Sequence, residues 1–230
     1  MSAEELQVNE ITQFHALSLP GIVHGFVSRV PGIDVAVERT LALQRLDTAH
    51  RVARMALGVG ALPFVTAEQV HGNAVAVVEK GQDLALAEIP LSGVDGIVTD
   101  AREVCLGIYV ADCCAVYLVD PRRPAIGLVH SGKKGTELGI VPAAIRAMHS
   151  TFGTVASDLM MQLSPCIRPP QYEWDFAAAI REQCRAAGVP ATQIHDDGRN
   201  TGADLERFYS YRMEKGRTGR MLAFLALRVE

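Results

Sequence analysis

Short apolar runs, each interrupted by polar or turn residues, dominate the middle of the chain. Four of them follow one another closely, at residues 94–99, 104–110, 115–119 and 125–129. Runs of this length predict strands of a sheet that is covered on both faces. Elsewhere the pattern predicts strands at residues 21–28, 158–163 and 221–229, and two strands within residues 63–78 around a turn at His71-Gly72-Asn73.

Helical periodicity marks other segments. A helix is expected from Asp34, as its cap, to about Leu57, with Gly58 ending it. Further helices are predicted at residues 139–152, 173–187 and 205–214, whereas residues 81–93 show no convincing period and are predicted to be a loop. No linker, repeat or low-complexity segment interrupts this pattern. It therefore predicts one mixed α/β domain over residues 1–230.

Composition narrows the class of protein. The 230 residues are 49% hydrophobic and carry a net charge of −4, with lysine and arginine spread along the chain, so no nucleic-acid surface is expected. The N-terminus is too polar for a signal peptide, and the longest apolar stretch is too short to span a bilayer. We expect a cytoplasmic protein without membrane partners. The five cysteines show no disulfide spacing.

Three residues able to bind a metal stand where predicted strands end: His71, Cys113 and His130. Two imidazoles and a thiolate suit zinc, and three protein ligands leave a fourth position open, as in catalytic sites. Their wide separation matches no compact metal motif, so the residues alone favour two hydrogen-bonded histidines and a core cysteine. Asp112 weighs against that view, because a carboxylate within an apolar run needs partners or a task.

The stretch from Ala125 to Gly139 runs from a strand through a glycine-containing turn into a helix. Free backbone N–H groups at such a helix start favour anions, and Lys133 and Lys134 would add positive charge. An ordinary turn with two solvated lysines is the alternative. The glycine spacing does not fit a P-loop.

Several ordered motifs together resemble the laccase-domain family, also called the YfiH-like or polyphenol oxidase family. They are HGFVSR, EQVHGNAV, DGIVTD, ADCCAVYLVDP, IGLVHSGKKGT, LSPCIRPPQYEW and FYSYR…GRTGRM. The resemblance implies a layered α/β/β/α fold with mixed sheets, related to cysteine hydrolases. It also implies a metal, usually zinc, held by His71, Cys113 and His130, which selects Cys113 over Cys114.

Two departures from the family pattern concern the substrate side. The family's H-A-G-W-R-G is replaced by His130-Ser131-Gly132-Lys133-Lys134-Gly135, so a tryptophan and an arginine have become lysines. A lysine cannot supply the two-pronged contact of an arginine. The family's segments that follow the N-terminal signature have no clear counterpart after Arg29.

The resemblance implies a zinc-dependent enzyme acting on purine nucleosides, by phosphorolysis with phosphate, by adenosine deamination, or by both. Asp112 and Cys113 are the expected catalytic residues, and a homodimer could form through an apolar face. The expected substrate contacts are Arg29, Gln69, Lys133 and Lys134. Three alternatives remain: a metal-free cysteine hydrolase of cell-wall precursors with Cys113 as nucleophile and His130 or His71 as base, a binding protein with a weakened site, and a copper phenol oxidase. The roles of Cys114 and Cys166 stay open.

Overall fold

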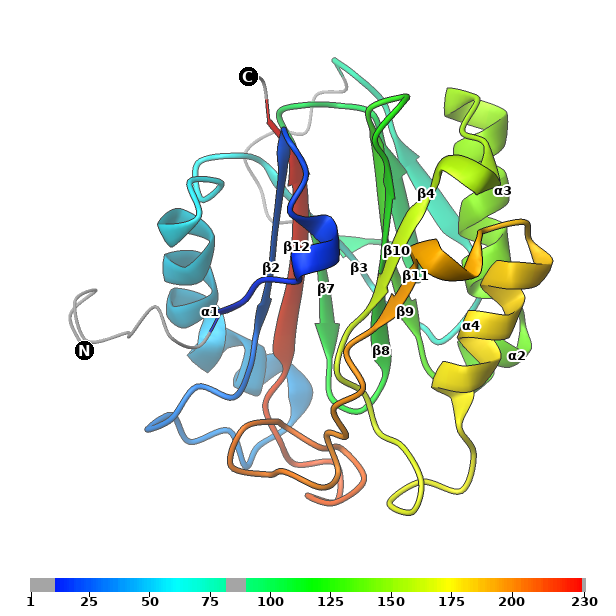
Figure 1. Ribbon diagram of the computed structural model, residues 1–230. Helices are drawn as coiled ribbons and strands as arrows, with labels where there is room; N and C mark the ends of the chain where they lie inside the picture. Colours follow the sequence, from blue (N-terminus) through cyan, green and yellow to red (C-terminus); the bar gives the residue numbers. More distant parts are fainter. Residues whose placement is uncertain (1–10, 82–89, 229–230) are drawn as a thin grey trace.

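The computed structural model describes residues 11–81 and 90–228 and forms a sandwich of two sheets with helices on both outer faces (Figure 1). The first sheet has the strand order β1-β2-β12-β7-β3-β5. Its strands are β1 (Ile11–Thr12), β2 (Ile22–Val27), β3 (Phe64–Ala67), β5 (Pro90–Leu91), β7 (Cys105–Val110) and β12 (Met221–Leu227). The layered, mixed α/β class predicted from the sequence is confirmed.

The second sheet has the order β11-β10-β8-β9-β6-β4. Its strands are β4 (Val75–Val78), β6 (Gly96–Thr99), β8 (Cys114–Asp120), β9 (Ala125–Ser131), β10 (Met160–Leu163) and β11 (Ile194–Asp196). Both sheets mix parallel and antiparallel pairs. The four central runs are therefore strands, but they are not in one sheet, because β7 belongs to the first sheet and β6, β8 and β9 to the second.

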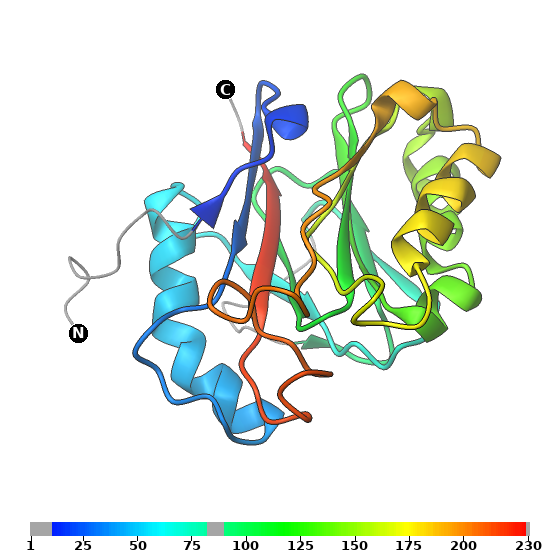
Figure 2. The same cartoon turned by 60° about the horizontal axis from the view of Figure 1, so that its bottom comes forward.

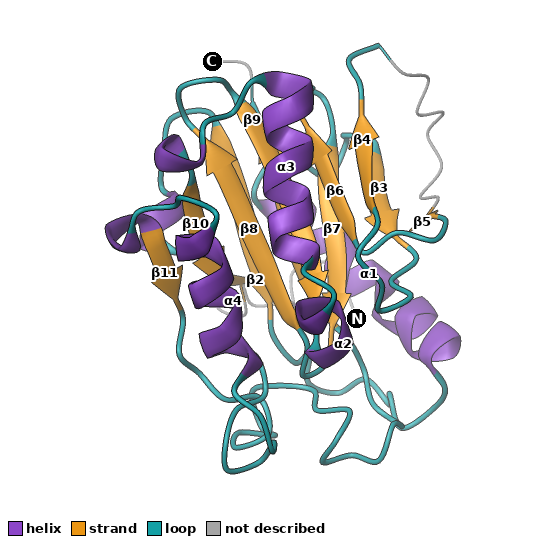
Figure 3. Cartoon of the chain, turned by 90° about the vertical axis from the view of Figure 1, so that its right-hand side faces the viewer, coloured by secondary structure: helices purple, strands orange, loops and turns teal. Residues whose placement is uncertain are grey.

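Helices cover the outer faces unequally. Helix α1 (Arg39–Ala56) lies on the first sheet, and α3 (Ile140–Phe152) and α4 (Phe176–Ala186) lie on the second, next to the short α2 (Lys133–Glu137) (Figure 3). Short 3-10 helices are at His15–Leu17, Ala156–Asp158 and Ala191–Gln193. In the described residues no helix is long and apolar enough to cross a bilayer.

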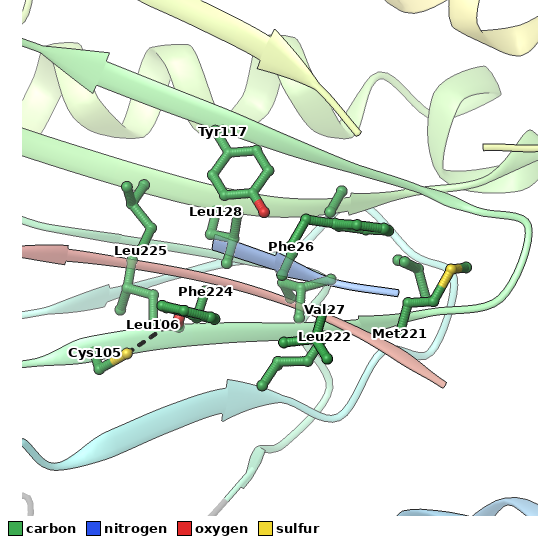
Figure 4. Close-up of a cluster of buried hydrophobic side chains, with 14 of the residues drawn as sticks. Phe26, Val27, Cys105, Leu106, Tyr117, Leu128, Met221, Leu222, Phe224 and Leu225 are labelled. Carbon is green, nitrogen blue, oxygen red and sulfur yellow. Dashed lines mark hydrogen bonds between the residues drawn. The ribbon is translucent and has the colours of Figure 1, made fainter. Parts of the chain in front are cut away.

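Apolar side chains from the facing strands fill the space between the sheets. Phe26, Leu106, Tyr117 and Leu225 all lie there, fully buried (Figure 4). The hydroxyl of Tyr117 on β8 donates to the carbonyl of Gly25 on β2 at 2.8 Å, so a buried hydrogen bond also joins the two sheets. A second apolar cluster packs β8, β9 and β10 against α3 and α4.

The start of one helix and the content of one predicted loop differ from the prediction. Helix α1 begins later than expected, because Glu38 is the cap and accepts from the amides of Thr40 and Leu41. Asp34 instead accepts from the Ala36 amide and pairs with Arg45 at 2.7 Å. Part of the predicted 81–93 loop is the short strand β5, and residues 82–89 lie outside the described residues.

The helix predicted at residues 205–214 is absent, and this prediction was wrong. The segment forms separate turns, such as Phe208 N to Asp204 O and Glu214 N to Ser210 O, both at 3.0 Å. Tyr209 points into the core and bonds to the backbone of Val30. Tertiary contacts made in different directions therefore replace a single apolar face.

Candidate metal centre

His71, Cys113 and His130 come together at one end of the sandwich, where loops pass from sheet to sheet. The loop with His71 joins β3 of the first sheet to β4 of the second, and the loop with Cys113 joins β7 to β8. His130 is near the end of β9. One nitrogen or sulfur atom from each residue lies within 4.8 Å of the others, the one grouping of this kind found in residues 11–81 and 90–228. Residues far apart in sequence thus form a group that could hold a metal ion.

The carboxylate of Asp95 orients this group, although the sequence pattern does not mark Asp95 as a site residue. Its carboxylate accepts from the Nδ1 of His130 at 2.8 Å and from the amides of His71 and Gly72 at 2.9 and 2.7 Å. The antiparallel pairing of β6 with β9 places Asp95 there. Carboxylates that bind a ligand histidine in this way fix the tautomer and ring orientation. The feature that could have identified Asp95 is its position, as an acidic residue directly before the apolar run of DGIVTD.

The pKa values of the Cys113 thiol and the His130 imidazole are shifted in opposite directions. Burial alone raises the pKa of Cys113, but the charge and hydrogen bonds of His130 and His71 outweigh it and lower the pKa to about 6. Burial alone lowers the pKa of His130, but Cys113 and Asp95 raise it to about 9. Burial raises the pKa of Asp95, yet hydrogen bonds from His130, Gly72 and His71 hold it below its usual range. The sulfur is therefore a thiolate near neutral pH, the form that binds metals.

A glycine makes room for the sulfur. Cys114 pairs with Ser131 in register, which brings Cys113 beside Gly132. A Cβ atom at residue 132 would lie only 2.4 Å from the Sγ of Cys113. Only glycine fits this close approach without displacing the sulfur.

Backbone strain is concentrated at the same place. Four non-glycine residues of the described segments have positive φ, and all four line one cavity: Gln69, His71, Asp112 and Lys215. Such conformations cost free energy and gather at functional sites when the surrounding structure enforces them. At His71 the positive φ is held by a hydrogen bond from the backbone N–H of His71 to the carboxylate of Asp95.

The cavity has a volume of about 1250 Å³ and lies above the three candidate ligands. Loops at this end of the sandwich surround it, including the loop before β12, which crosses the gap between the sheets in Figure 2. Its lining holds two carboxylates, Glu38 and Asp112, and seven cationic side chains: Arg39, Lys133, Lys134, Arg212, Lys215, Arg217 and Arg220. A chain of net charge −4 thus encloses a positively charged cavity.

Two of the expected catalytic and substrate-binding residues line the cavity but already have partners. The amide of Gln69 donates to the carbonyl of Tyr109 at 2.6 Å and accepts from its N–H at 3.0 Å. Asp112 accepts from the Thr201 hydroxyl and from the Arg212 amide, at 2.8 and 2.7 Å. Both side chains therefore hold neighbouring loops in place.

Arg29 is not brought to the cavity lining. Its guanidinium donates to the carbonyl of Phe208 and pairs with Glu214 at 2.8 Å, over the ring of Tyr209. Glu214 also accepts from the Ser210 amide. Arg29 thus supports from behind the loop that carries several of the cavity's cations.

Lys133 and Lys134 are exposed on the cavity wall within helix α2, not in a turn before it. Lys133 lies 3.7 Å from Glu173, which also pairs with Arg212 at 3.1 Å. A helix of five residues provides little dipole, so the positive charge here comes from the side chains.

The two neighbouring cysteines point away from the cavity. Cys114 and Cys166 are both fully buried, and the Cys114 thiol lies 3.7 Å from the Ser164 carbonyl. Contact with Cys114 and burial raise the pKa of Cys166. Cys166 therefore remains protonated in the core, in contrast to Cys113.

Comparison with known proteins agrees with this geometry. A sequence model of the family described as multi-copper polyphenol oxidoreductase laccase matches residues 41–177 and 170–228. The chain is 31% identical to purine nucleoside phosphorylase YlmD of Geobacillus stearothermophilus, over 90% of this chain and 88% of the relative. It is 33% identical to purine nucleoside phosphorylase SCO2081 of Streptomyces coelicolor, over 70% and 66%.

Solved structures show the same fold. The crystal structure of YlmD from Geobacillus stearothermophilus superposes with a TM-score of 0.76 at 26% identity, covering 96% of this chain and 99% of the other. Bacillus licheniformis hypothetical protein YfiH gives a TM-score of 0.79 at 22% identity, covering 96% and 100%. The sequence match extends along most of the chain, and the chain belongs to the multi-copper polyphenol oxidoreductase laccase family, the laccase-domain family that its motifs resembled.

Proposed function

We propose that this protein is a zinc-dependent purine nucleoside phosphorylase. In this reaction phosphate displaces the purine base from C1′ of the ribose, so that the N-glycosidic bond breaks and ribose 1-phosphate forms. The observation that carries the proposal is the convergence of His71, Cys113 and His130 at a cation-lined cavity. The names of the relatives support the substrate class.

The residues present fit a zinc ion. Two imidazoles and a thiolate are common zinc ligands, and three of them leave one coordination position for water or substrate. Asp95 orients the ring of His130, and Gly132 leaves space for the sulfur of Cys113, so both favour binding of a metal by these residues. A bound zinc would polarise an oxygen of the substrate or acidify a water. Oxidation of phenols by dioxygen calls for several coppers, whereas the described segments offer one three-residue group.

The chain's own residues would share the remaining work. Asp95 would keep His130 oriented, and Asp112 would hold the loop of Arg212 at the cavity wall. Lys133 and Lys134, in place of the family's tryptophan and arginine, would attract an anion to the entrance without fixing its orientation. We assign Gln69 to positioning, since both ends of its amide bind Tyr109.

The test combines metal content with turnover. Elemental mass spectrometry of untagged protein is expected to give about one zinc per chain. Inosine with phosphate should then yield hypoxanthine and ribose 1-phosphate, and the yield should fall when a chelator is added or phosphate is omitted. Adenosine is assayed in parallel, because its conversion to inosine would reveal the deamination expected from the family. Bound zinc without any nucleoside product would contradict the proposed function.

A second candidate, a metal-free cysteine hydrolase, is favoured by one observation. The carboxylate of Asp95 orients the imidazole of His130, and this imidazole in turn lowers the pKa of the Cys113 thiol. This is the arrangement of an activated nucleophile with its base. Inactivation by a thiol alkylator, with no effect of a chelator, would favour the hydrolase. Protection of Cys113 from alkylation by zinc would favour the phosphorylase.

A further inference from the structure

Arg220 is a buried cation beside the candidate metal centre. It immediately precedes β12, whose first residue, Met221, pairs with Val110 at the end of β7. The chain after Val110 runs on to Cys113. Arg220 is 8% exposed and lines the cavity. The pairing of β12 with β7 therefore brings a buried guanidinium to the cavity that the three candidate ligands and the exposed Lys133 and Lys134 also line.

This guanidinium has no carboxylate partner. One of its nitrogens, Nη1, donates to the carbonyls of Thr218 and Gly219, both at 2.9 Å. No ion pair links Arg220 to any acidic side chain in the part of the chain that the structure describes. A buried charge without a direct ion-pair partner is costly. The remaining donors of the fork are thus available to a ligand in the cavity.

Charges of both signs surround Arg220. Burial lowers the pKa of Arg220 and the nearby charge of Arg39 lowers it further, whereas the charges of Cys113, Tyr211 and Asp112 raise it. Both carboxylates of the lining are occupied elsewhere: Glu38 caps helix α1, and Asp112 accepts from Thr201 and Arg212. Two like charges, Arg39 and Arg220, therefore line the cavity, and neither forms an ion pair with a carboxylate of the described lining.

The backbone that presents Arg220 is fixed in advance. A Cβ atom on Gly219 would lie 2.6 Å from the ring of Tyr209, so this residue packs directly on the ring. Tyr209 in turn bonds to Val30 through its hydroxyl. The hydroxyl of Thr218 donates to Glu214 at 2.6 Å. A donor held in place before the ligand arrives loses little entropy on binding.

We propose that Arg220, supported by Arg39, forms an oxyanion subsite that binds a dianionic phosphate group next to the metal centre. The proposal rests on the proposed function for the identity of the anion. The planar fork of an arginine matches two oxygens of phosphate, which the lysines of the wall cannot do. The phosphate could be the free co-substrate or a group carried by the nucleoside.

Calorimetric titration of the zinc-loaded protein with inorganic phosphate tests the subsite without turnover. Arg220→Gln is expected to weaken phosphate binding roughly 10- to 100-fold, and Arg220→Lys by less, because charge is kept while the fork is lost. Arg217→Gln is the matched control. It removes one positive charge from an exposed arginine of the same lining, held by the Ala36 carbonyl, and should cost at most about 5-fold. Equal weakening by Arg217→Gln and Arg220→Gln would overturn the proposal.

Zinc content and thermal unfolding show whether Arg220→Gln has folded. If it has not, the exposed Arg39→Gln still tests the subsite, with an expected weakening of roughly 3- to 10-fold. Unchanged phosphate binding in Arg39→Gln and in Arg220→Lys would then reject it.

Titration with inosine 5′-monophosphate separates the two sources of phosphate. If the phosphate is carried by the substrate, this nucleotide binds more tightly than inosine, displaces inorganic phosphate, and loses affinity in Arg220→Gln. If the phosphate is free, inosine and inorganic phosphate bind together. Binding of neither phosphate form to wild-type protein rejects the subsite. Phosphate binding through Arg220 without cleavage of inosine would refute the proposed function and leave the subsite intact.

Discussion

Two buried histidines in different regions of the molecule have opposite acid–base character. His130, at the candidate metal centre, is 4% exposed, and His50, in helix α1, is 2% exposed. The pKa of His130 is raised to about 9, whereas burial and the charge of Arg54 lower the pKa of His50 to about 3, against the opposing effect of the Arg220 backbone.

The two histidines are similarly buried, so the difference between their pKa values comes from the groups around each ring. His130 has Asp95 on one ring nitrogen and Cys113 nearby, both anionic. Neither ring nitrogen of His50 has a hydrogen-bond partner of good geometry, and its neighbour Arg54 is a cation. An imidazole in the core is thus neutral by default, and a site must supply negative charge to make it anything else. Four experiments would break or sharpen this contrast.

Removing the thiolate has the largest expected effect. Cys113→Ser takes away one of three ligands and the charge that most strongly supports His130, so stoichiometric zinc binding should be lost. Metal content after dialysis against zinc measures this. Cys114→Ala is the matched control, because its buried thiol points away from the cavity, and it should retain zinc. Retention of zinc by Cys113→Ser would remove Cys113 from the ligand set.

Asp95→Asn comes next, because it keeps the shape of the side chain and removes its charge. Zinc affinity is expected to fall roughly 10- to 100-fold, since partners of ligand histidines have effects of this size. Competition with a chromophoric chelator measures it. Asp100→Asn, in the same DGIVTD segment but paired with Lys80 at the surface, should leave zinc affinity unchanged. An unaltered affinity in Asp95→Asn would show that the backbone alone orients His130.

His50 makes the free energy of unfolding depend on pH in the acid range. Its folded pKa lies below the ordinary value of 6.5, so the unfolded chain binds a proton that the folded chain does not. Stability from this residue is therefore present above pH 6.5 and falls as pH drops toward 3, by about 2 kcal/mol between pH 6.5 and 5.

Urea unfolding of wild type and His50→Leu at several pH values measures that difference. The variant should lose less stability in acid than wild type. His15→Gln, at an exposed position, should follow wild type within about 0.5 kcal/mol. Identical acid dependence in wild type and His50→Leu would show that His50 does not titrate as expected.

The last experiment changes no residue and observes the imidazole rings of His130 and His50 directly. In metal-free protein, nitrogen NMR should show His130 protonated at pH 7 and losing its proton near pH 9, while His50 stays neutral down to about pH 3. A folded pKa raised in this way gives stability that is complete below pH 6.5 and disappears as pH rises through about 9. Zinc should abolish the titration of His130 and leave His50 unchanged.

The sequence predicted much of this arrangement, but not the parts set by tertiary contacts. Apolar runs identified the central strands, yet a run does not say which sheet it enters, so β7 was grouped with β8 and β9. Motifs selected His71, Cys113 and His130, which the structure brings together. Asp95 was missed because a carboxylate before a strand resembles an ordinary turn residue. Arg29 was expected at the substrate, and only the folded chain shows it paired with Glu214.

The loops that carry His71 and Cys113 each cross from one sheet to the other, and this has a consequence for folding. A metal ion held by both loops and by β9 can bind with full affinity only after the two sheets have docked. Its binding free energy is therefore linked to the assembly of the sandwich. At a free zinc concentration one hundred times the dissociation constant, this linkage would add about 2.7 kcal/mol to the free energy of unfolding. The abundance of the folded protein would then follow the supply of zinc, independently of any substrate.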